Sequence, residues 1–251
     1  MAAEASDNPV LGAFKMFSEE LTAKHDKYER IVKISRDITI ESKRLIFTLH
    51  NLPKGDAKTL DNSTLENIKG RLKKIEESHF KRIAIELENE DAYLYHRAYT
   101  WGVQEYVEAL TYFEFINNNH LVEWENVTER CKFTIKPDSP DGESRTLTLL
   151  VPLTDYILGV MDMTGEVMRY CISALGAGDP TAARKACEFV KYVYCALHQI
   201  SMGHKEYAQK FEVAGQSLGK MEYNCYLAKM QRLDDPSGPR LRCEVSPADG
   251  S

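Results

Sequence analysis

The chain has 251 residues, of which 43% are hydrophobic and 28% are charged, and its formal net charge is −6. This composition is ample for a core, and the negative charge argues against a protein that grips nucleic acid through its overall charge, although a locally basic surface stays open. No flexible linker divides the sequence, and no apolar run approaches the ~20 residues that span a bilayer. We therefore expect one soluble domain without a membrane partner.

The cysteines and the first residues of the chain give the cellular setting. Six cysteines are scattered without a Cys-x-x-Cys motif, which predicts reduced thiols that pack as small apolar groups instead of a disulfide framework or a zinc site. Residues 1–8 lack the basic and apolar regions of a secretory signal. We expect an intracellular protein.

The first predicted helix runs from Pro9 to Leu52 and ends before Pro53. Apolar residues recur close to a heptad pattern, and at ~1.5 Å per residue such a helix is roughly 65 Å long. Because this exceeds the width of a compact small domain, we expect an elongated bundle or an assembly. The residues predicted to face inward are Phe14, Phe17, Leu21, Tyr28, Ile31, Ile38, Leu45, Leu49 and Leu52.

Helical periodicity continues through the rest of the chain and predicts a seven-helix, all-α bundle. Further helices are expected at about 65–87, 90–119, 121–130, 153–175, 180–200 and 207–228. Between the fourth and fifth helices, the β-prone segments 133–135 and 146–151 flank a stretch rich in proline and glycine, which predicts a hairpin-like excursion or a mobile loop. We expect a single domain over residues 9–232, with disordered ends at 1–8 and 233–251.

The third predicted helix carries two acids where its pattern asks for apolar residues. An ionised carboxylate that is buried without a partner costs several kcal/mol or more, so Glu105 and Glu108 need a cation, a proton or a basic side chain. A Glu-x-x-Glu pair on a helix is more often a solvated face, and only its place on the apolar stripe favours a site. The predicted stripe is Leu94, Ala98, Trp101, Glu105, Glu108, Tyr112 and Phe115.

A second acidic pair lies on the fifth predicted helix. Asp162 and Glu166 are four residues apart and therefore point the same way, one turn from each other. Two helices that each offer a carboxylate pair can hold one or two hard divalent cations, Mg²⁺ or Mn²⁺, and a bound water can then become a nucleophile. The alternative is structural, because Arg169 follows Glu166 by three residues and can pair with it.

Four segments resemble one family. They are AKHDKYERIVKISRDITIESKR (23–44), QEYVEA (104–109), DYILGVMDMTGE (155–166) and KMEYNCY (220–226). Together they resemble the translin family, and within it the translin-associated factor X group, over roughly residues 9–232. Plain translin shares the fold but lacks the paired carboxylates of the third helix, so the resemblance is to the catalytic partner of translin.

The resemblance implies a function. Members of this group assemble with translin into a hetero-oligomeric barrel that receives single-stranded RNA, and the complex is a Mg²⁺-dependent endoribonuclease. It removes the passenger strand in RNA interference and processes transfer-RNA precursors. Glu105, Glu108, Asp162 and Glu166 match the acidic cluster of the group and are the candidate catalytic and metal-binding residues. Family members often carry a basic nuclear-localisation stretch near the N-terminus, which residues 1–10 lack, so we expect the cytoplasm first and the nucleus second.

Other assignments stay open at this point. His96 and Arg97 are candidates for contacts with RNA phosphates, with a core or surface-pair role as the alternative. The acids can also belong to a non-catalytic RNA-binding or scaffolding subunit, in which basic residues of a partner compensate them. A di-iron bundle is disfavoured, because Glu76 and His79 form a single Glu-x-x-His motif and such bundles need two.

Overall fold

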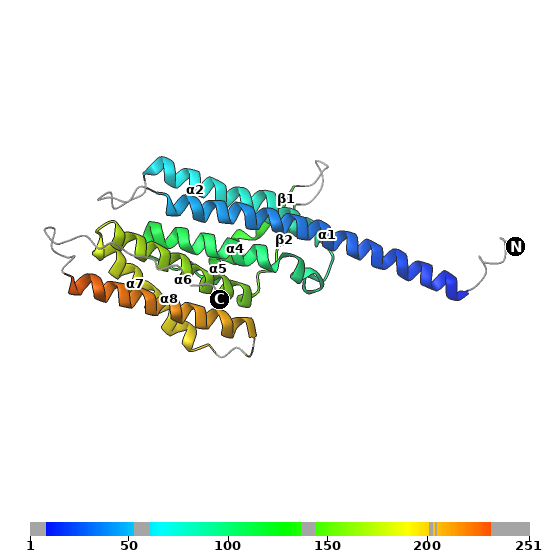
Figure 1. Cartoon of the computed structure of the whole chain (residues 1–251). Coiled ribbons are helices and arrows are strands. Elements are labelled where there is room, and N and C mark those ends of the chain that lie inside the picture. The colour runs from blue at the N-terminus through cyan, green and yellow to red at the C-terminus, as the bar shows by residue number, and fades with distance from the viewer. Residues whose placement is uncertain (1–8, 53–60, 137–143, 201–202, 204, 232–251) are drawn as a thin grey trace.

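The computed structural model describes residues 9–52, 61–136, 144–200, 203 and 205–231. Long helices lie side by side along one direction, which confirms the predicted elongated all-α bundle (Figure 1). The predicted ends 1–8 and 233–251 lie outside the described residues. The helices are α1 (Pro9–His50), α2 (Asn62–Ile75), the π-helix η1 (Glu76–Phe80), α3 (Lys81–Glu86), α4 (Ala92–Asn118), α5 (Trp124–Arg130), α6 (Leu153–Gly176), α7 (Pro180–His198) and α8 (Lys205–Met230).

Capping residues explain where several helices begin. The side chain of Asp61 accepts a hydrogen bond from the backbone of Thr64, Asp91 caps α4 in the same way, and Asp179 caps α7 ahead of Pro180. Each carboxylate satisfies a backbone N–H that has no partner within the helix. The helix boundaries therefore follow from local sequence, and they agree closely with those predicted.

The second predicted helix is confirmed as one rod with an irregular turn. α2, η1 and α3 follow one another without a break. The π-helical turn brings both Glu76 and Phe80 to the buried side. Glu76 accepts hydrogen bonds from the hydroxyl of Tyr106 (2.5 Å) and from Arg130 (2.9 Å), and the ring of Phe80 meets that of Tyr106 edge-on. A buried acid is thus satisfied by two donors.

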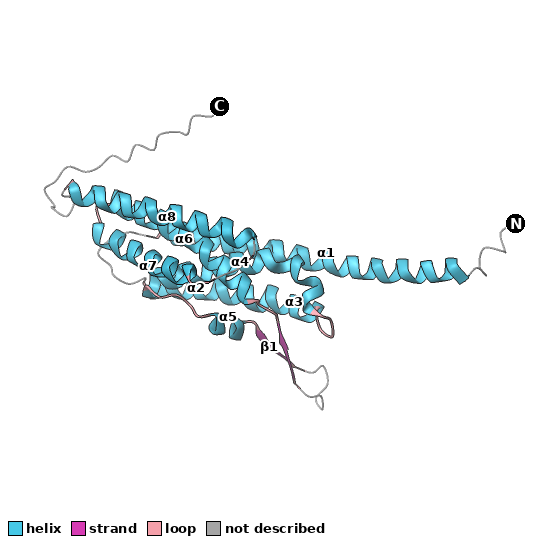
Figure 2. Cartoon of the chain, turned by 90° about the horizontal axis from the view of Figure 1, so that it is seen from below, coloured by secondary structure: helices cyan, strands magenta, loops and turns pink. Residues whose placement is uncertain are grey.

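The excursion between the fourth and fifth predicted helices is a short antiparallel hairpin. Strand β1 (Lys132–Ile135) pairs with β2 (Arg145–Thr148) beside α5 (Figure 2). In this pairing Phe133 lies opposite Leu147. Phe133 is buried, which anchors the hairpin to the bundle. Residues 137–143, on which the prediction of a mobile loop depends, lie outside the described part of the chain.

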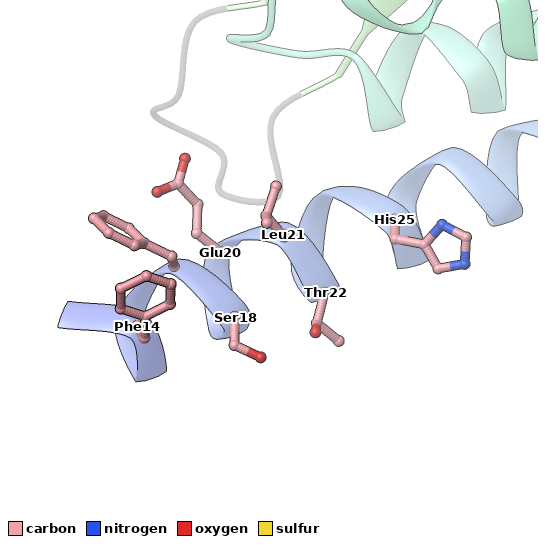
Figure 3. A pocket seen from close by; sticks show the side chains of 7 residues that line it. Phe14, Ser18, Glu20, Leu21, Thr22 and His25 are labelled. Atoms are coloured by element: carbon pink, nitrogen blue, oxygen red, sulfur yellow. The ribbon is translucent and has the colours of Figure 1, made fainter. Parts of the chain in front are cut away.

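The two halves of α1 differ in what covers them. Ile31, Ile38 and Leu45 are fully buried against the bundle. Phe14 and Leu21, whose side chains are drawn in Figure 3, are in contrast 67% and 65% exposed. This end of α1 extends beyond the other helices (Figure 1). The prediction that they face inward was wrong for this chain alone. Periodicity shows which residues share a face, but it does not show whether another element covers that face.

Helix α4 lies at the centre and packs closely against α1 and α6. A side chain at Gly102 would place its Cβ 2.7 Å from Oγ of Ser35, and one at Gly159 would place its Cβ 2.7 Å from the backbone oxygen of Gln104. Both distances are shorter than real Cβ contacts, so these glycines permit the close approach. Gly102 sets the spacing between α4 and α1, and Gly159 sets the spacing between the acids of α4 and those of α6. None of the described helices is long and apolar enough to cross a bilayer.

Candidate functional site

Acids from two helices meet in a cavity of about 340 Å³ between α4, α6 and α8. Three of the four predicted acids line it, and Glu166 lies one turn further along α6, where its charge still acts on Glu108. The structure therefore brings the predicted cluster together at one place. The lining residues are Glu105, Glu108, Met161, Asp162, Gly165, Gln209, Lys210 and Val213.

The acids of α4 are half-buried for a different reason from the one the sequence suggested. Leu94 and Trp101, predicted to share their inward face, are 67% and 60% exposed. Helix α4 instead buries the face that carries Tyr99 and Tyr106. That part of the predicted stripe was wrong. Glu105 and Glu108 lie at the margin of the buried face, where α6 and α8 cover them.

Glu108 is the acid with the strongest electrostatic perturbation. Within the described part of the chain its carboxyl group makes no hydrogen bond or ion pair. Burial and, in decreasing order, the negative charges of Asp162, Glu105 and Glu166 together raise the pKa of Glu108 to about 8, and the charge of Lys43 opposes them. At neutral pH the group therefore favours its proton, and a cation that entered the cavity would displace that proton.

Glu105 is only partly compensated. Its Oε1 lies 2.9 Å from the ammonium of Lys43 on α1, whereas its Oε2 is buried and has no hydrogen-bond partner in the described structure. Buried polar atoms without a partner are rare, because each one loses its hydration without a replacement. One carboxylate oxygen is therefore available to a ligand.

Lys210 holds the acid from α6. Its ammonium lies 2.7 Å from Oδ2 of Asp162 and donates to the side-chain oxygen of Gln104 at 2.9 Å. Burial raises the pKa of Asp162, and the hydrogen bond and charge of Lys210 oppose that rise. The sequence interpretation missed Lys210. The available signal was its spacing on α8, three residues after Tyr207 and four before Ala214, both of them on the buried stripe.

Glu166 is held by a histidine from the far end of the first helix. Nε2 of His50, the last residue of α1, lies 2.6 Å from Oε2 of Glu166, and Nδ1 of His50 lies 3.0 Å from the hydroxyl of Tyr112. Arg169 also pairs with Glu166 at 3.2 Å, as the structural alternative proposed. Nothing in the local sequence links His50 to Glu166, so this contact was not predicted.

The remaining candidates lie outside the cavity. His96 binds Asp155, with 2.6 Å between its Nε2 and Oδ2, and Arg97 is exposed on the surface; neither lines the acidic cavity. In the single Glu-x-x-His motif, Glu76 is bonded to Tyr106 and Arg130, and burial lowers the pKa of His79. These contacts give His96 and Glu76 structural roles.

The chemistry of the cavity fits a hard divalent cation. Its charged acceptors are carboxylate oxygens, one of them is an orphaned buried atom, and Glu108 lies in an excess of negative charge. The described histidines, cysteines and acids form no ready-made group of three metal ligands. Mg²⁺ does not require one, because it usually keeps several waters and binds through one or two carboxylates. Glu105 and Glu108 are the two with free oxygens.

Comparison with known proteins identifies the family. The sequence pattern of the translin family matches residues 26–232. The chain belongs to the translin family. It is 39% identical to translin-associated protein X of Mus musculus over 91% of this chain and 81% of the relative. It is 31% identical to the translin-associated protein X homolog of Schizosaccharomyces pombe, over 88% of this chain and 89% of the relative.

Solved structures show the same fold. The chain resembles apo-NeC3PO with a TM-score of 0.64 and 20% identity, covering 85% of this chain and 96% of that one. It resembles AfC3PO in a complex with duplex RNA with a TM-score of 0.63 and 19% identity, covering 89% of this chain and all of that one. At these identities the likeness establishes the architecture of this translin-family chain, and its activity must be argued from the site.

Proposed function

We propose that this chain is the RNA-cleaving subunit of a hetero-oligomer with translin, a Mg²⁺-dependent endoribonuclease acting on single-stranded RNA. The observation that carries the proposal is the position of Glu108, whose burial and crowding by other carboxylates raise its pKa to about 8. A cluster that disfavours its own ionisation is what a cation site requires, and perturbed pKa values concentrate at functional sites. The relatives are named for an association with translin, which supports the choice of partner.

The acids and their basic neighbours divide the work in this proposal. Glu105, Glu108 and Asp162 line the cavity and would hold the ion, and Glu166 would add its charge from one turn away. When bound, Mg²⁺ supplies a Lewis acid for the phosphoryl oxygen and a water of lowered pKa. Glu108 would have to lose its proton to bind the ion. Lys43 and Lys210 pair with Glu105 and Asp162 and orient their carboxylates. By family resemblance, the substrates are nicked passenger strands and transfer-RNA precursors.

The proposed assembly also accounts for the uncovered end of α1. Phe14, Phe17 and Leu21 expose more than half of their surface along one stretch of helix (Figure 3). Apolar surface of this kind is buried when chains assemble. We expect the isolated chain to self-associate, and a well-behaved monomer in analytical ultracentrifugation would contradict that expectation.

The decisive experiment is cleavage of an end-labelled single-stranded RNA by the chain co-expressed with translin. We expect cleavage with Mg²⁺, none with chelator, and a loss of about 100-fold or more in Glu108→Ala and Glu105→Ala complexes that still assemble. Glu114→Ala is the matched control, because Glu114 lies on the same helix and bonds Asn118 (2.8 Å) away from the cavity. Unchanged cleavage by the assembled Glu108→Ala complex would refute the assignment.

One observation favours a second function, that of a non-catalytic RNA-binding or scaffolding subunit. Lys43, Lys210 and His50 each already pair with one of the acids, so the cluster has structural partners within the chain. The same assay separates the two functions. A scaffold would bind the RNA equally with Mg²⁺ and with chelator, and would show no cleavage in either condition.

A further inference from the structure

Three cysteines, one each from α6, α7 and α8, lie close together away from the acidic cavity. Sγ of Cys171 on α6 lies 3.8 Å from Sγ of Cys225 on α8, and Cys187 on α7 is near enough to Cys225 to affect the pKa of its thiol. Cys225 is 15 residues beyond Lys210 on the same helix, which corresponds to roughly 22 Å along its axis. The thiol cluster is therefore separate from the acidic cavity.

The surroundings of the three thiols make one of them the nucleophile. The hydrogen bond with Cys171 lowers the pKa of Cys225 to about 7; burial opposes this shift, and Cys187 and the charge of Arg184 add to it. The pKa values of Cys171 and Cys187 are raised. Cys225 is half-buried, whereas Cys171 is fully buried. Because the thiolate is the reactive form, Cys225 reacts first, and the neighbouring Cys171 is the resolving thiol.

The same arrangement disfavours a metal at this place. Within the described part of the chain, no group of three cysteines, histidines or acids is arranged to hold an ion. The two sulfurs are nevertheless close. A disulfide requires an S–S distance of about 2.05 Å, so side-chain rotation must bring Cys171 and Cys225 together by roughly 2 Å. Cys171 has one further contact, with the backbone oxygen of Ala183 at 3.4 Å, which that rotation would break.

We propose that Cys171 and Cys225 are a peroxide-oxidised pair that forms a reversible disulfide between α6 and α8. The Cys225 thiolate attacks one oxygen of hydrogen peroxide, the O–O bond breaks, and the departing hydroxide takes up the proton that Cys225 had lost. Cys225 is then a sulfenic acid. The sulfur of Cys171 attacks the sulfenic sulfur, and the hydroxyl leaves with the Cys171 proton as water. Two thiols lose two electrons, and one peroxide becomes two waters.

The crosslink would act on the helices that build the cavity. Helix α6 carries Asp162 and helix α8 carries Lys210, and the two are already joined by that ion pair. A disulfide near Cys225 adds a covalent joint at the other end of the same helix pair. Because it closes a loop of more than fifty residues, the oxidised chain should unfold at a temperature higher by about 5 °C or more.

The test uses the full-length chain co-expressed with translin. The complex is treated with hydrogen peroxide, remaining thiols are blocked with iodoacetamide, and the chain is digested without reductant for mass spectrometry. We expect a peptide that links Cys171 to Cys225 and disappears with reductant. Cys195 on α7 is the internal control, because it is exposed and outside the cluster. The link should form at peroxide levels several-fold below those that oxidise Cys195.

Variants distinguish this pair from other pairings. In Cys171→Ala we expect Cys225 to stop at the sulfenic acid, which dimedone traps, whereas Cys187→Ser should leave the link intact. The wild-type digestion stands even if a variant fails to fold. Oxidation of Cys195 without the link, a link from Cys225 to Cys187, or sulfinic acid at Cys225 in its place would each overturn the proposal.

Discussion

Asp155 and Glu108 are acids on the same α4–α6 interface, but only Asp155 is surrounded by hydrogen-bond donors. Asp155 is 2% exposed and accepts hydrogen bonds from His96 (2.6 Å), Thr100 (2.8 Å) and Gln104 (3.2 Å). Glu108 is less deeply buried, yet it lacks such donors and its pKa is raised to about 8. The deeper acid is therefore the structural one, and absence of compensation marks the candidate site better than burial does.

A chain of polar contacts joins the two regions. Gln104 donates its amide to Asp155 and accepts with its side-chain oxygen from Lys210, which in turn pairs with Asp162 in the cavity. Gln104 is itself buried, so both ends of its amide must be satisfied. The structural network thus fixes the position of the lysine that lies against the acids.

The largest expected effect is on the structural side of the comparison. Asp155→Ala should lower the free energy of unfolding by about 3–5 kcal/mol, because His96, Thr100 and Gln104 lose a buried acceptor. Glu108→Gln should change it far less at neutral pH, because Glu108 already favours its neutral form. Urea unfolding of both variants within the translin complex measures the difference. Equal losses of stability would show that Glu108 is as important to the fold as Asp155, which would contradict the distinction between a structural acid and a site acid.

The next effect is a pH dependence that belongs to Glu108. Below pH 4.5 its carboxyl is neutral in both states; above it, the unfolded chain ionises while the folded chain keeps its proton up to pH about 8. Stability contributed by this group therefore falls as pH rises from 4.5 to 8. The full difference between the folded and unfolded pKa values of Glu108 corresponds to at most about 5 kcal/mol of stability. We expect a loss of about 2 kcal/mol, because the cavity is open to solvent.

Glu108→Gln isolates the contribution of Glu108 to the pH dependence of stability, because the amide does not ionise. The raised pKa of Asp162 adds a fall in the same direction, so only the difference between wild type and variant is informative. Unfolding in urea at pH 5 and pH 8 should show a smaller decline in the variant. Parallel declines would mean that Glu108 ionises normally in the folded chain.

The smallest expected effect concerns the spacing between α4 and α6, the helices that carry the two acids. Gly159→Ala would bring a Cβ to 2.7 Å from the backbone oxygen of Gln104 and 2.8 Å from Cβ of Val107. We expect a loss of about 1–2 kcal/mol and a lower pKa of Glu108 as water enters the loosened interface. Gly165→Ala is the control, since nothing lies within 4 Å of its Cβ, and it should stabilise the helix slightly. Thermal unfolding of both variants checks the sign.

Much of the fold was predictable because it depends on local sequence. Helix lengths follow from periodicity and from caps such as Asp91 and Asp179, and the hairpin follows from β-prone segments around a turn-rich stretch. The rotation of α4 about its axis was not predictable from its own pattern. The helix is apolar on two sides, against α1 and α6, so Leu94 and Trp101 fit the period without being covered.

The residues of the candidate site also differ in how far they could be predicted from local sequence. The acids of α4 and α6 could be found because each pair is local, with spacings of three and four residues. Lys210 and His50 could not, because their partners lie on other helices and the contacts arise only in the folded bundle. The uncovered end of α1 has the same cause, since what would bury Phe14 is not part of this chain's described structure.

The π-helical turn at Glu76–Phe80 is a place where the rod from α2 to α3 can change in length by one residue. Its wider turn holds one residue more than an α-helical turn does, so Ile75 before it and Ile83 after it are both buried. Deleting one residue within the turn would restore regular α-helical bonding and leave Ile83 and Ala84 in the core. Deleting one residue from the regular helix α2 would instead rotate one part of the rod against the other by about 100°.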